Sequence, residues 1–258
     1  VRGGQDDKWY IVLPSGPVQK HANGDTAFAD ASELYAGRST EKARVIVLDA
    51  VTGQYARLRD KNPGSIPGPD PLVVSEERSF FNDTFTPRAY KENIDRAKNT
   101  WRHHVVYLGL AARDANNYDS GALYRLQMVD ESTGAPLAVE DWKLKRLYRT
   151  DKPITGAANS SYDKLGNLWV LFGTGRIWGA EDMTPCVGRE SQTPPCVNCY
   201  EQYMFGIKEP LDADGRMTFA EVAKDNNIVD VSGVAVYTKG DVDPPVAGYS
   251  NYEDLYLH

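Results

Sequence analysis

The sequence predicts an all-β protein made of many short strands. Its 258 residues are 41% hydrophobic, enough for the core of one large domain or two small ones. Aromatic residues are plentiful, with 15 tyrosines and 5 tryptophans, and the 22 glycines and 15 prolines favour turns over long helices. A third observation is that strand-like segments recur in pairs with a common pattern. These features together predict short strands joined by turns.

Three pairs of segments carry this pattern. In each pair the first member is a β-branched and aromatic run that ends in small residues, and the second member alternates and then reaches a turn. The pairs are 9–17 with 43–54, 104–114 with 121–134, and 167–178 with 201–215. A first member of this composition is typical of a strand that is buried on both faces beside another backbone.

The turns after the second members are also alike. The pattern D-x-x-T-G occurs at 49–53 and again at 130–134. Asp and Thr side chains in such a turn bond to the local backbone, and the glycine takes a positive φ. The third turn is looser and ends in Asp212, Asp214 and Gly215.

A recurring order of strand, insertion, strand and tight turn predicts a partial β-propeller with long inter-strand insertions. The small residues would let the inner strands approach neighbouring sheets closely, and the insertions would lie at 18–42, 59–100 and 179–198. Residues 61–71, rich in Pro and Gly, are expected to be a surface loop, and 86–104 a short helix or an irregular loop. The chain is interpreted as one domain, 1–258, with about three blades, a piece of a longer protein.

The charge of the chain excludes some partners. A net charge of −7 without a basic run repels phosphate backbones, so no nucleic-acid partner is expected. No stretch approaches the roughly 20 apolar residues of a membrane helix, so no membrane span is expected either.

The three cysteines, Cys186, Cys196 and Cys199, share one Pro-rich insertion. We expect a disulfide there, most simply between Cys186 and either Cys196 or Cys199, and an oxidising compartment. A zinc site would need a fourth ligand, and no His lies near in sequence. Tyr200 follows the C-V-N-C run where a c-type haem site needs His.

Asp212, Asp214 and Glu221 fall at positions 3, 5 and 12 of an EF-hand-like loop, which makes calcium the candidate cofactor. Position 1 is Pro210, and an acidic hairpin turn is the alternative interpretation. His103 and His104 precede a strand, so one is expected to face the interior and the other the solvent. No nucleophile motif occurs, and the sequence therefore predicts a protein that is not an enzyme.

Segment 154–178, ITGAANSSYDKLGNLWVLFGTGRIW, resembles a motif of the PilC/PilY family of type IV pilus tip proteins. In that family a C-terminal β-propeller carries a similar D-x-x-G-N-x-W-V-x-F-G-T-G-R run. The flanking pieces HVVYLGLAARD, GALYRLQM and CYEQYMFGIKEP are similar to further family strands, so the resemblance covers most of residues 8–210.

The resemblance implies a pilus tip adhesin and pilus biogenesis factor, located outside the cell at the pilus tip or on the outer cell surface. The implied partners are minor pilins and a host or abiotic surface. Several family members bind calcium through an Asp-rich loop ahead of the V-V-Y strand. Here Asp95 and Asn99 keep only part of that ligand set.

Two other classes remain open from the sequence. The D-A-V-T-G turn also resembles the repeats of quinoprotein dehydrogenase propellers, although the adjacent-cysteine pair of that class is absent. The other class is a protein-interaction propeller on the cell surface that has no connection with pili.

Overall fold

The described strands confirm the all-β class. The computed structural model describes residues 1–20, 26–28, 39–59, 68–82, 86–88, 102–113, 119–175 and 202–223. The chain divides into two compact units, Val1–Lys224 and Asp225–His258, and every described residue belongs to the first. Apart from a 3-10 turn at Val139–Asp141, the regular structure of the described residues consists of strands.

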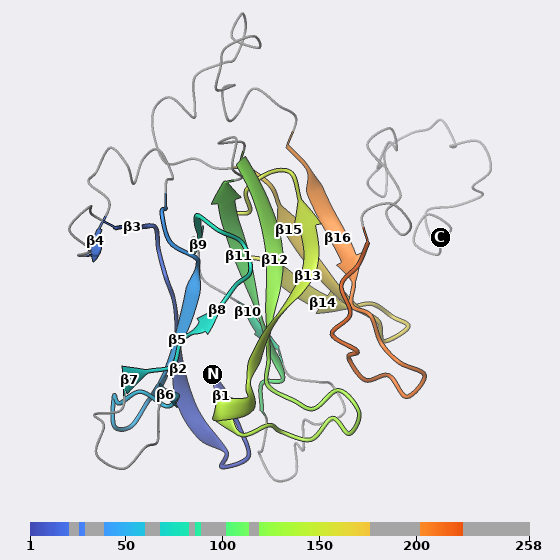
Figure 1. Ribbon diagram of the computed structural model, residues 1–258. Helices are drawn as coiled ribbons and strands as arrows, with labels where there is room; N and C mark the ends of the chain where they lie inside the picture. The colour runs from blue at the N-terminus through green and yellow to red at the C-terminus, as the bar shows by residue number, and fades with distance from the viewer. Residues whose placement is uncertain are drawn as a thin grey trace, which may run out of the picture. The chain divides into compact units, whose positions relative to one another are not determined.

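The strands form three antiparallel sheets and two short ladders (Figure 1). In the first sheet the order is β1 (Arg2–Gly3), β2 (Lys8–Pro14), β5 (Arg44–Asp49) and β8 (Leu72–Val73). In the central sheet the order is β10 (Thr86–Arg88), β11 (Val105–Arg113), β12 (Asp119–Gln127) and β13 (Lys143–Thr150), with β9 (Ser79–Phe81) also paired to β11. In the third sheet the order is β14 (Asn159–Tyr162), β15 (Leu168–Gly173) and β16 (Met204–Lys208). The ladders are β3 (Val18–Lys20) with β4 (Thr26–Phe28), and β6 (Leu58–Arg59) with β7 (Gly68–Pro69).

Each pair of segments predicted from the repeat is an antiparallel strand pair in its own sheet. These pairs are β2 with β5, β11 with β12, and β15 with β16. The helix considered for 86–104 is wrong at its start, because Thr86–Arg88 is strand β10 and pairs with β11. Within the predicted surface loop, Gly68–Pro69 forms the short ladder with β6, away from the centre of any sheet.

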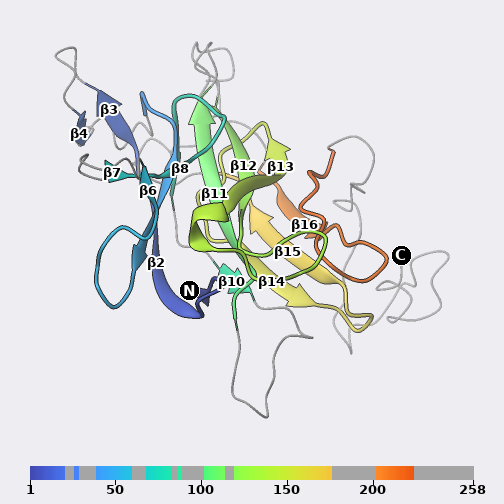
Figure 2. The same ribbon diagram turned by 60° about the horizontal axis from the view of Figure 1, so that its bottom comes forward.

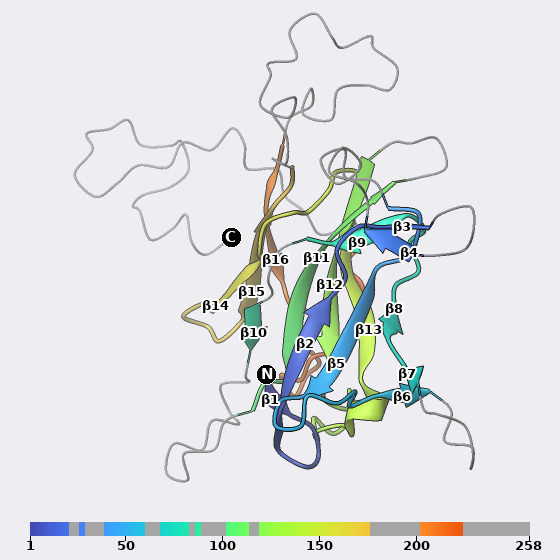
Figure 3. The ribbon, with the colours of Figure 1, turned by 90° about the vertical axis from the view of Figure 1, so that its left-hand side faces the viewer.

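The first sheet packs one face on the central sheet. Alternate residues of β2 and β5 point inward, so Tyr10, Val12, Val45 and Val47 are buried. They share one apolar cluster with alternate residues of the central strands and with Trp142, whose ring lies edge-on to Tyr10 at 5.1 Å. In Figure 3, β2 and β5 run side by side in front of β11 and β12. Core residues contributed by β11 and β12 are Val106, Leu108, Leu110, Ala112, Ala122, Tyr124 and Leu126.

The third sheet packs on the opposite face of the central sheet. Tyr148 of β13 contacts the stacked rings of Phe172 and Phe205, with centroids 6.2 and 5.2 Å away. At the sheet margins β13 contacts β8 and β10 contacts β14, and Figure 2 shows the second of these pairs side by side. The second cluster also contains Val105, Tyr107, Leu123, Leu147, Leu168, Val170 and Ile207.

The central sheet is therefore covered on both faces. Every residue of β11 from Val105 to Ala112 is buried, which explains why this strand reads as a continuous apolar run. Strand β13 lies at the margin of the sheet and is rich in Lys and Arg, charges that discourage edge-to-edge pairing with another chain.

Segment 152–156 passes very close to the backbone of β11 and β12. The Ile154 amide donates to the carbonyl of Leu110, and Ile154 also forms a parallel bridge to Gly175. An added Cβ at Gly121 would lie 2.3 Å from the Lys152 carbonyl oxygen, and one at Gly109 would lie 2.9 Å from the Ile154 carbonyl oxygen. The prediction of close backbone approach at the small residues of the first members is confirmed at Gly109, and Gly121, in a second member, shows a close approach that was not predicted. Gly16 has no atom within 4 Å of an added Cβ, so the expectation is wrong there.

Gly121→Ala should destabilise the protein by about 1–3 kcal/mol, because the new methyl group meets fixed backbone rather than a movable side chain. Urea denaturation of the purified chain measures this loss as a lower midpoint. Gly156→Ala is the matched control, since an added Cβ there meets nothing within 4 Å. Equal midpoints for the two variants would contradict the close approach.

Candidate functional site

The two D-x-x-T-G turns have the same geometry, as the sequence predicts. In the first, one Asp49 carboxylate oxygen accepts from the amides of Val51 and Thr52, both at 2.9 Å, and Gly53 has φ 69°. In the second, Asp130 accepts in the same way from Ser132 and Thr133, and Gly134 has φ 67°. Hydrogen bonds from the Ser132 hydroxyl and the Thr133 amide and hydroxyl lower the pKa of Asp130 to about 2.

A second kind of turn also occurs twice. The Asp163 carboxylate accepts from the amides of Leu165 and Asn167, and Gly166 has φ 86°. The other oxygen accepts from the Asn167 amide group and the Trp169 indole, and these bonds lower the pKa of Asp163 to about 2. The Asp212 turn repeats the backbone pattern, with bonds from the amides of Asp214 and Arg216.

The three calcium candidates have separate hydrogen-bond partners. Asp212 caps its own turn, and Asp214 accepts from Arg216 at 2.6 Å. Glu221 instead accepts from both the Nε and Nη2 atoms of Arg146, at 2.8 and 3.0 Å. Among the described residues no group of three or more His, Cys, Asp or Glu side chains could hold a metal ion. Calcium at Asp212, Asp214 and Glu221 stays a prediction that these contacts do not support.

The disulfide prediction falls outside the described residues. The segment 176–201, which contains Cys186, Cys196 and Cys199, is not among the described residues. Segment 89–101, which contains Asp95 and Asn99, is not described either.

The expectation that one histidine of the pair faces the interior is confirmed at His104, whereas His103 is half-buried and does not simply face the solvent. His104 is 2% exposed, and burial lowers its pKa to about 4. His103 is half-buried, and its Nδ1 accepts a hydrogen bond from the Arg2 amide at 3.0 Å. Burial lowers the pKa of His103 to about 4 as well, so both imidazoles are neutral at pH 7.

Unfolding stability should fall between pH 6.5 and pH 4, because the unfolded chain binds a proton at His104 that the folded chain excludes. For His104 the full difference is about 3 kcal/mol, and none of it acts above pH 6.5. Urea denaturation across this range measures the slope. Glu209, whose pKa burial raises, acts in the opposite direction, so the test is the difference between the native chain and His104→Gln. An unchanged slope in His104→Gln would show that His104 is protonated in the folded protein.

A buried ion pair connects the central sheet with the third sheet. Arg125 on β12 donates to Glu209, which follows β16, and neither side chain has exposed surface. The other carboxylate oxygen of Glu209 accepts from the Tyr107 hydroxyl at 2.9 Å. The second terminal nitrogen of Arg125 donates to the Arg146 and Ala220 carbonyl oxygens, and its guanidinium lies over the Phe219 ring. Burial raises the pKa of Glu209, while Arg125 and Tyr107 oppose that rise.

A second network joins all three sheets. Arg146 on β13 donates to Glu76 at 2.7 Å and to Glu221, so it links the segment after β8 to the segment after β16. Tyr124 also donates to Glu76, and its hydroxyl lies 3.2 Å from that of Ser75. Burial tends to raise the pKa of Glu76, but the bonds from Tyr124 and Arg146 outweigh it and lower the pKa.

Arg125→Met should destabilise the protein by about 3–5 kcal/mol, because it leaves the Glu209 carboxylate buried without its cation. The double variant Arg125→Met with Glu209→Leu should recover most of this loss, since two apolar groups need no partner. Chemical denaturation of both variants gives the comparison. If the double variant is as unstable as the single one, packing around Arg125 matters rather than the unpaired charge.

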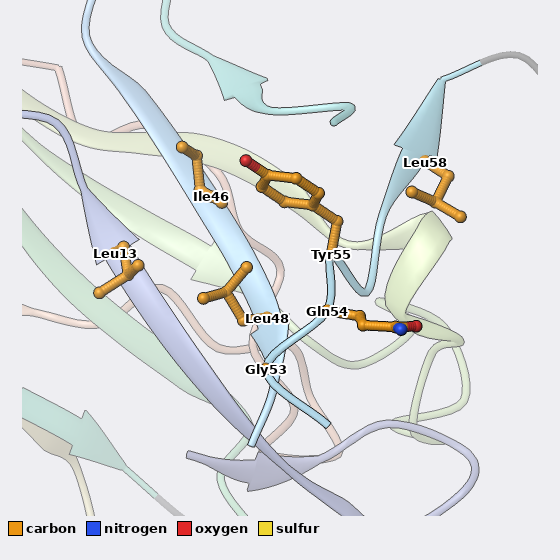
Figure 4. Close-up of a pocket in the computed structure, with 7 residues that line it drawn as sticks. All are labelled: Leu13, Ile46, Leu48, Gly53, Gln54, Tyr55 and Leu58. Atoms are coloured by element: carbon orange, nitrogen blue, oxygen red, sulfur yellow. The ribbon is translucent and has the colours of Figure 1, made fainter. Parts of the chain in front are cut away.

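The outward face of the first sheet is apolar and open, and it is the candidate site. Trp9, Ile11 and Leu13 of β2 are 49%, 43% and 43% exposed. An open groove of about 550 Å³ lies on this face (Figure 4). Figure 4 shows Ile46 and Leu48 on β5 between Leu13 and Tyr55. The remaining lining residues are Gly53, Gln54 and Leu58.

The groove contains no carboxylate, imidazole, thiol or amine among its lining residues. Its surface consists of aliphatic side chains, one amide and one phenol, a composition that packs against another apolar surface. The expectation that the first member of each pair is buried on both faces is confirmed for β11 and wrong for β2, whose alternate residues Trp9, Ile11 and Leu13 are exposed. The sequence analysis also missed Arg125, whose signal is a charge within the apolar L-Y-R-L run.

Comparison of the chain with protein-family models, with curated proteins and with solved structures finds no match. The described residues contain no helix with the length and apolar character needed to cross a membrane. Fold and site define an all-β protein with three antiparallel sheets and an exposed apolar sheet face.

Proposed function

We propose that the chain contributes blades of a β-propeller and acts as a type IV pilus tip adhesin and pilus biogenesis factor of the PilC/PilY kind, without enzymatic activity. In this function the propeller is displayed outside the cell, contacts minor pilins and binds a host or abiotic surface. The proposal rests on three properties of the described sheets.

The first property is the strand order. The first sheet runs β1-β2-β5-β8, and the main path of the central sheet runs β10-β11-β12-β13. Both are four-stranded antiparallel meanders in chain order, and the third sheet repeats the order with β14-β15-β16. A propeller blade is a four-stranded antiparallel sheet, so recurrence of this order supports the assignment.

The second property is the packing, and it is the observation that carries the proposal. Consecutive sheets pack face to face in chain order, the first on the central and the central on the third. Propeller blades pack in this way around their axis, whereas a sandwich has two sheets with one core between them. Two separate cores on opposite faces of one sheet favour the propeller.

The third property is the role of the motif that resembles the pilus proteins. Asp163, Asn167 and Trp169 are bonded to one another within the β14–β15 turn. Gly175, the last described residue of the segment, donates its amide to the carbonyl oxygen of Pro153, the residue before the segment begins, at 2.8 Å. The described residues of this segment thus form one hydrogen-bonded unit, which supports treating them together as a structural motif.

Immunogold electron microscopy tests the function. Antibodies raised against the purified chain should label pilus tips on cells that encode it, and deletion of the gene should remove this label and reduce adhesion. Complementation with the Gly156→Ala variant, which adds no close contact, is expected to restore both.

Two outcomes would contradict the proposal. Label confined to the cell body would favour an interaction propeller that has no connection with pili. Dye-linked alcohol oxidation by the purified chain after addition of a quinone cofactor would favour the dehydrogenase alternative.

A further inference from the structure

The peptide bond between Asp70 and Pro71 is chemically weaker than most peptide bonds. A prolyl nitrogen carries no hydrogen and is substituted by a second carbon, so it accepts a proton more readily than other amide nitrogens and leaves as a secondary amine. The aspartate before it carries a carboxylate that can reach its own carbonyl carbon. The sequence contains this bond at Asp70–Pro71 and again at Asp243–Pro244, and the second lies outside the described residues.

One arginine contacts both reacting groups of Asp70. The Nε atom of Arg57 donates to the Asp70 carbonyl oxygen at 3.2 Å, and its Nη2 atom donates to Oδ2 of the Asp70 carboxylate at 3.1 Å. The Asp70 amide donates in turn to the Arg57 carbonyl oxygen at 3.1 Å, next to the ladder between β6 and β7. The guanidinium therefore holds the carboxylate and the carbonyl group of the same residue at one cation.

The position of Arg57 is fixed by a second set of contacts. Its Nη1 atom donates to the carbonyl oxygens of Val139 and Glu140, at 2.7 and 2.6 Å, in the 3-10 turn before β13. The Arg57 side chain is 10% exposed, whereas that of Asp70 is 38% exposed, so water reaches the aspartate. A cation held in place before a reaction stabilises developing negative charge without having to reorganise.

We propose that the chain cleaves its own Asp70–Pro71 bond. A carboxylate oxygen of Asp70 attacks the Asp70 carbonyl carbon, and negative charge develops on the carbonyl oxygen to which Arg57 donates. The Pro71 nitrogen takes a proton from solvent as its bond to the carbonyl carbon breaks, which leaves a cyclic anhydride at Asp70. Water then opens the anhydride. The products are Asp70 with two carboxylates and Pro71 with a free secondary amine, and the net reaction consumes one water molecule.

The fold keeps the two products together. Strand β8 begins at Leu72 and pairs with β5, and Leu72 and Val74 are buried in the cluster between the first and central sheets. Cleavage therefore creates two new chain ends at the surface without separating the pieces. The reaction is a single event on the chain itself, and it does not depend on the pilus function proposed above.

Incubation of the purified chain in a mildly acidic buffer in which it stays folded tests the proposal. Intact mass measured after unfolding should show two pieces, one that ends at Asp70 and one that begins at Pro71. Light scattering before unfolding should still show one particle. The bond should break about a hundredfold faster than in the chain unfolded by urea in the same buffer, where Asp243–Pro244 supplies the rate without Arg57.

Two variants separate the roles of the residues. Asp70→Asn removes the nucleophilic carboxylate and should leave this bond intact. Arg57→Lys keeps the positive charge but loses the planar fork that reaches both oxygens, so cleavage should slow about a hundredfold. Arg44→Lys is the matched control, since Arg44 is paired with Glu41 instead, and it should cleave at the native rate. Urea denaturation of each variant reports separately whether it folds.

Three results would overturn the proposal. One is an Asp70–Pro71 bond that stays intact in the folded chain. Another is an equal cleavage rate in the folded and unfolded chain, because Arg57 contacts Asp70 only in the folded state. The third is a native rate in a fully folded Arg57→Lys variant, which would make the contacts of Arg57 purely structural.

Discussion

Burial of the central sheet on both faces is the constraint on which the rest of the structure depends. A sheet covered on one side can place polar side chains on the other, but β11 and β12 have no such side. Arg125 is therefore enclosed together with its charge, and it is stabilised there by Glu209, by the carbonyl oxygens of Arg146 and Ala220 and by the Phe219 ring. Phe219 takes a φ of 51°, a strained conformation for this residue, and burial holds it in place beneath the guanidinium.

The same constraint explains how the sheets are connected. The apolar clusters supply most of the contact area between the sheets, but the hydrophobic effect does not favour any one orientation of the sheets. The arginines form directional contacts, because Arg125 on β12 bonds to Glu209 after β16, and Arg146 on β13 bonds to the segments that follow β8 and β16. Relative placement of neighbouring sheets thus depends on a few charged hydrogen bonds set within large apolar surfaces.

The sequence predicted the parts of this fold that depend on local pattern. The strand pairs, the Asp49 and Asp130 turns and the buried His104 follow from alternation, turn chemistry and adjacency within the chain. Strands β1, β8 and β10 are two or three residues long and were missed, because such short segments carry no readable periodicity. The Arg125–Glu209 pair was missed because its members are distant in sequence and meet only when two sheets stack. The apolar face was missed because pattern alone does not say how many neighbours a sheet has.

The turns that close the strand pairs have a further consequence for how the chain reaches this structure. Every bond described for the Asp130 turn joins atoms within a few residues of one another, so the turn can form before distant segments are present. During synthesis the first pair of strands can associate as soon as it leaves the ribosome. Each later pair can then pack on a sheet that has already folded. The order in which the sheets stack is also the order in which they are synthesised, so none of the described strands has to insert between two sheets that have already formed.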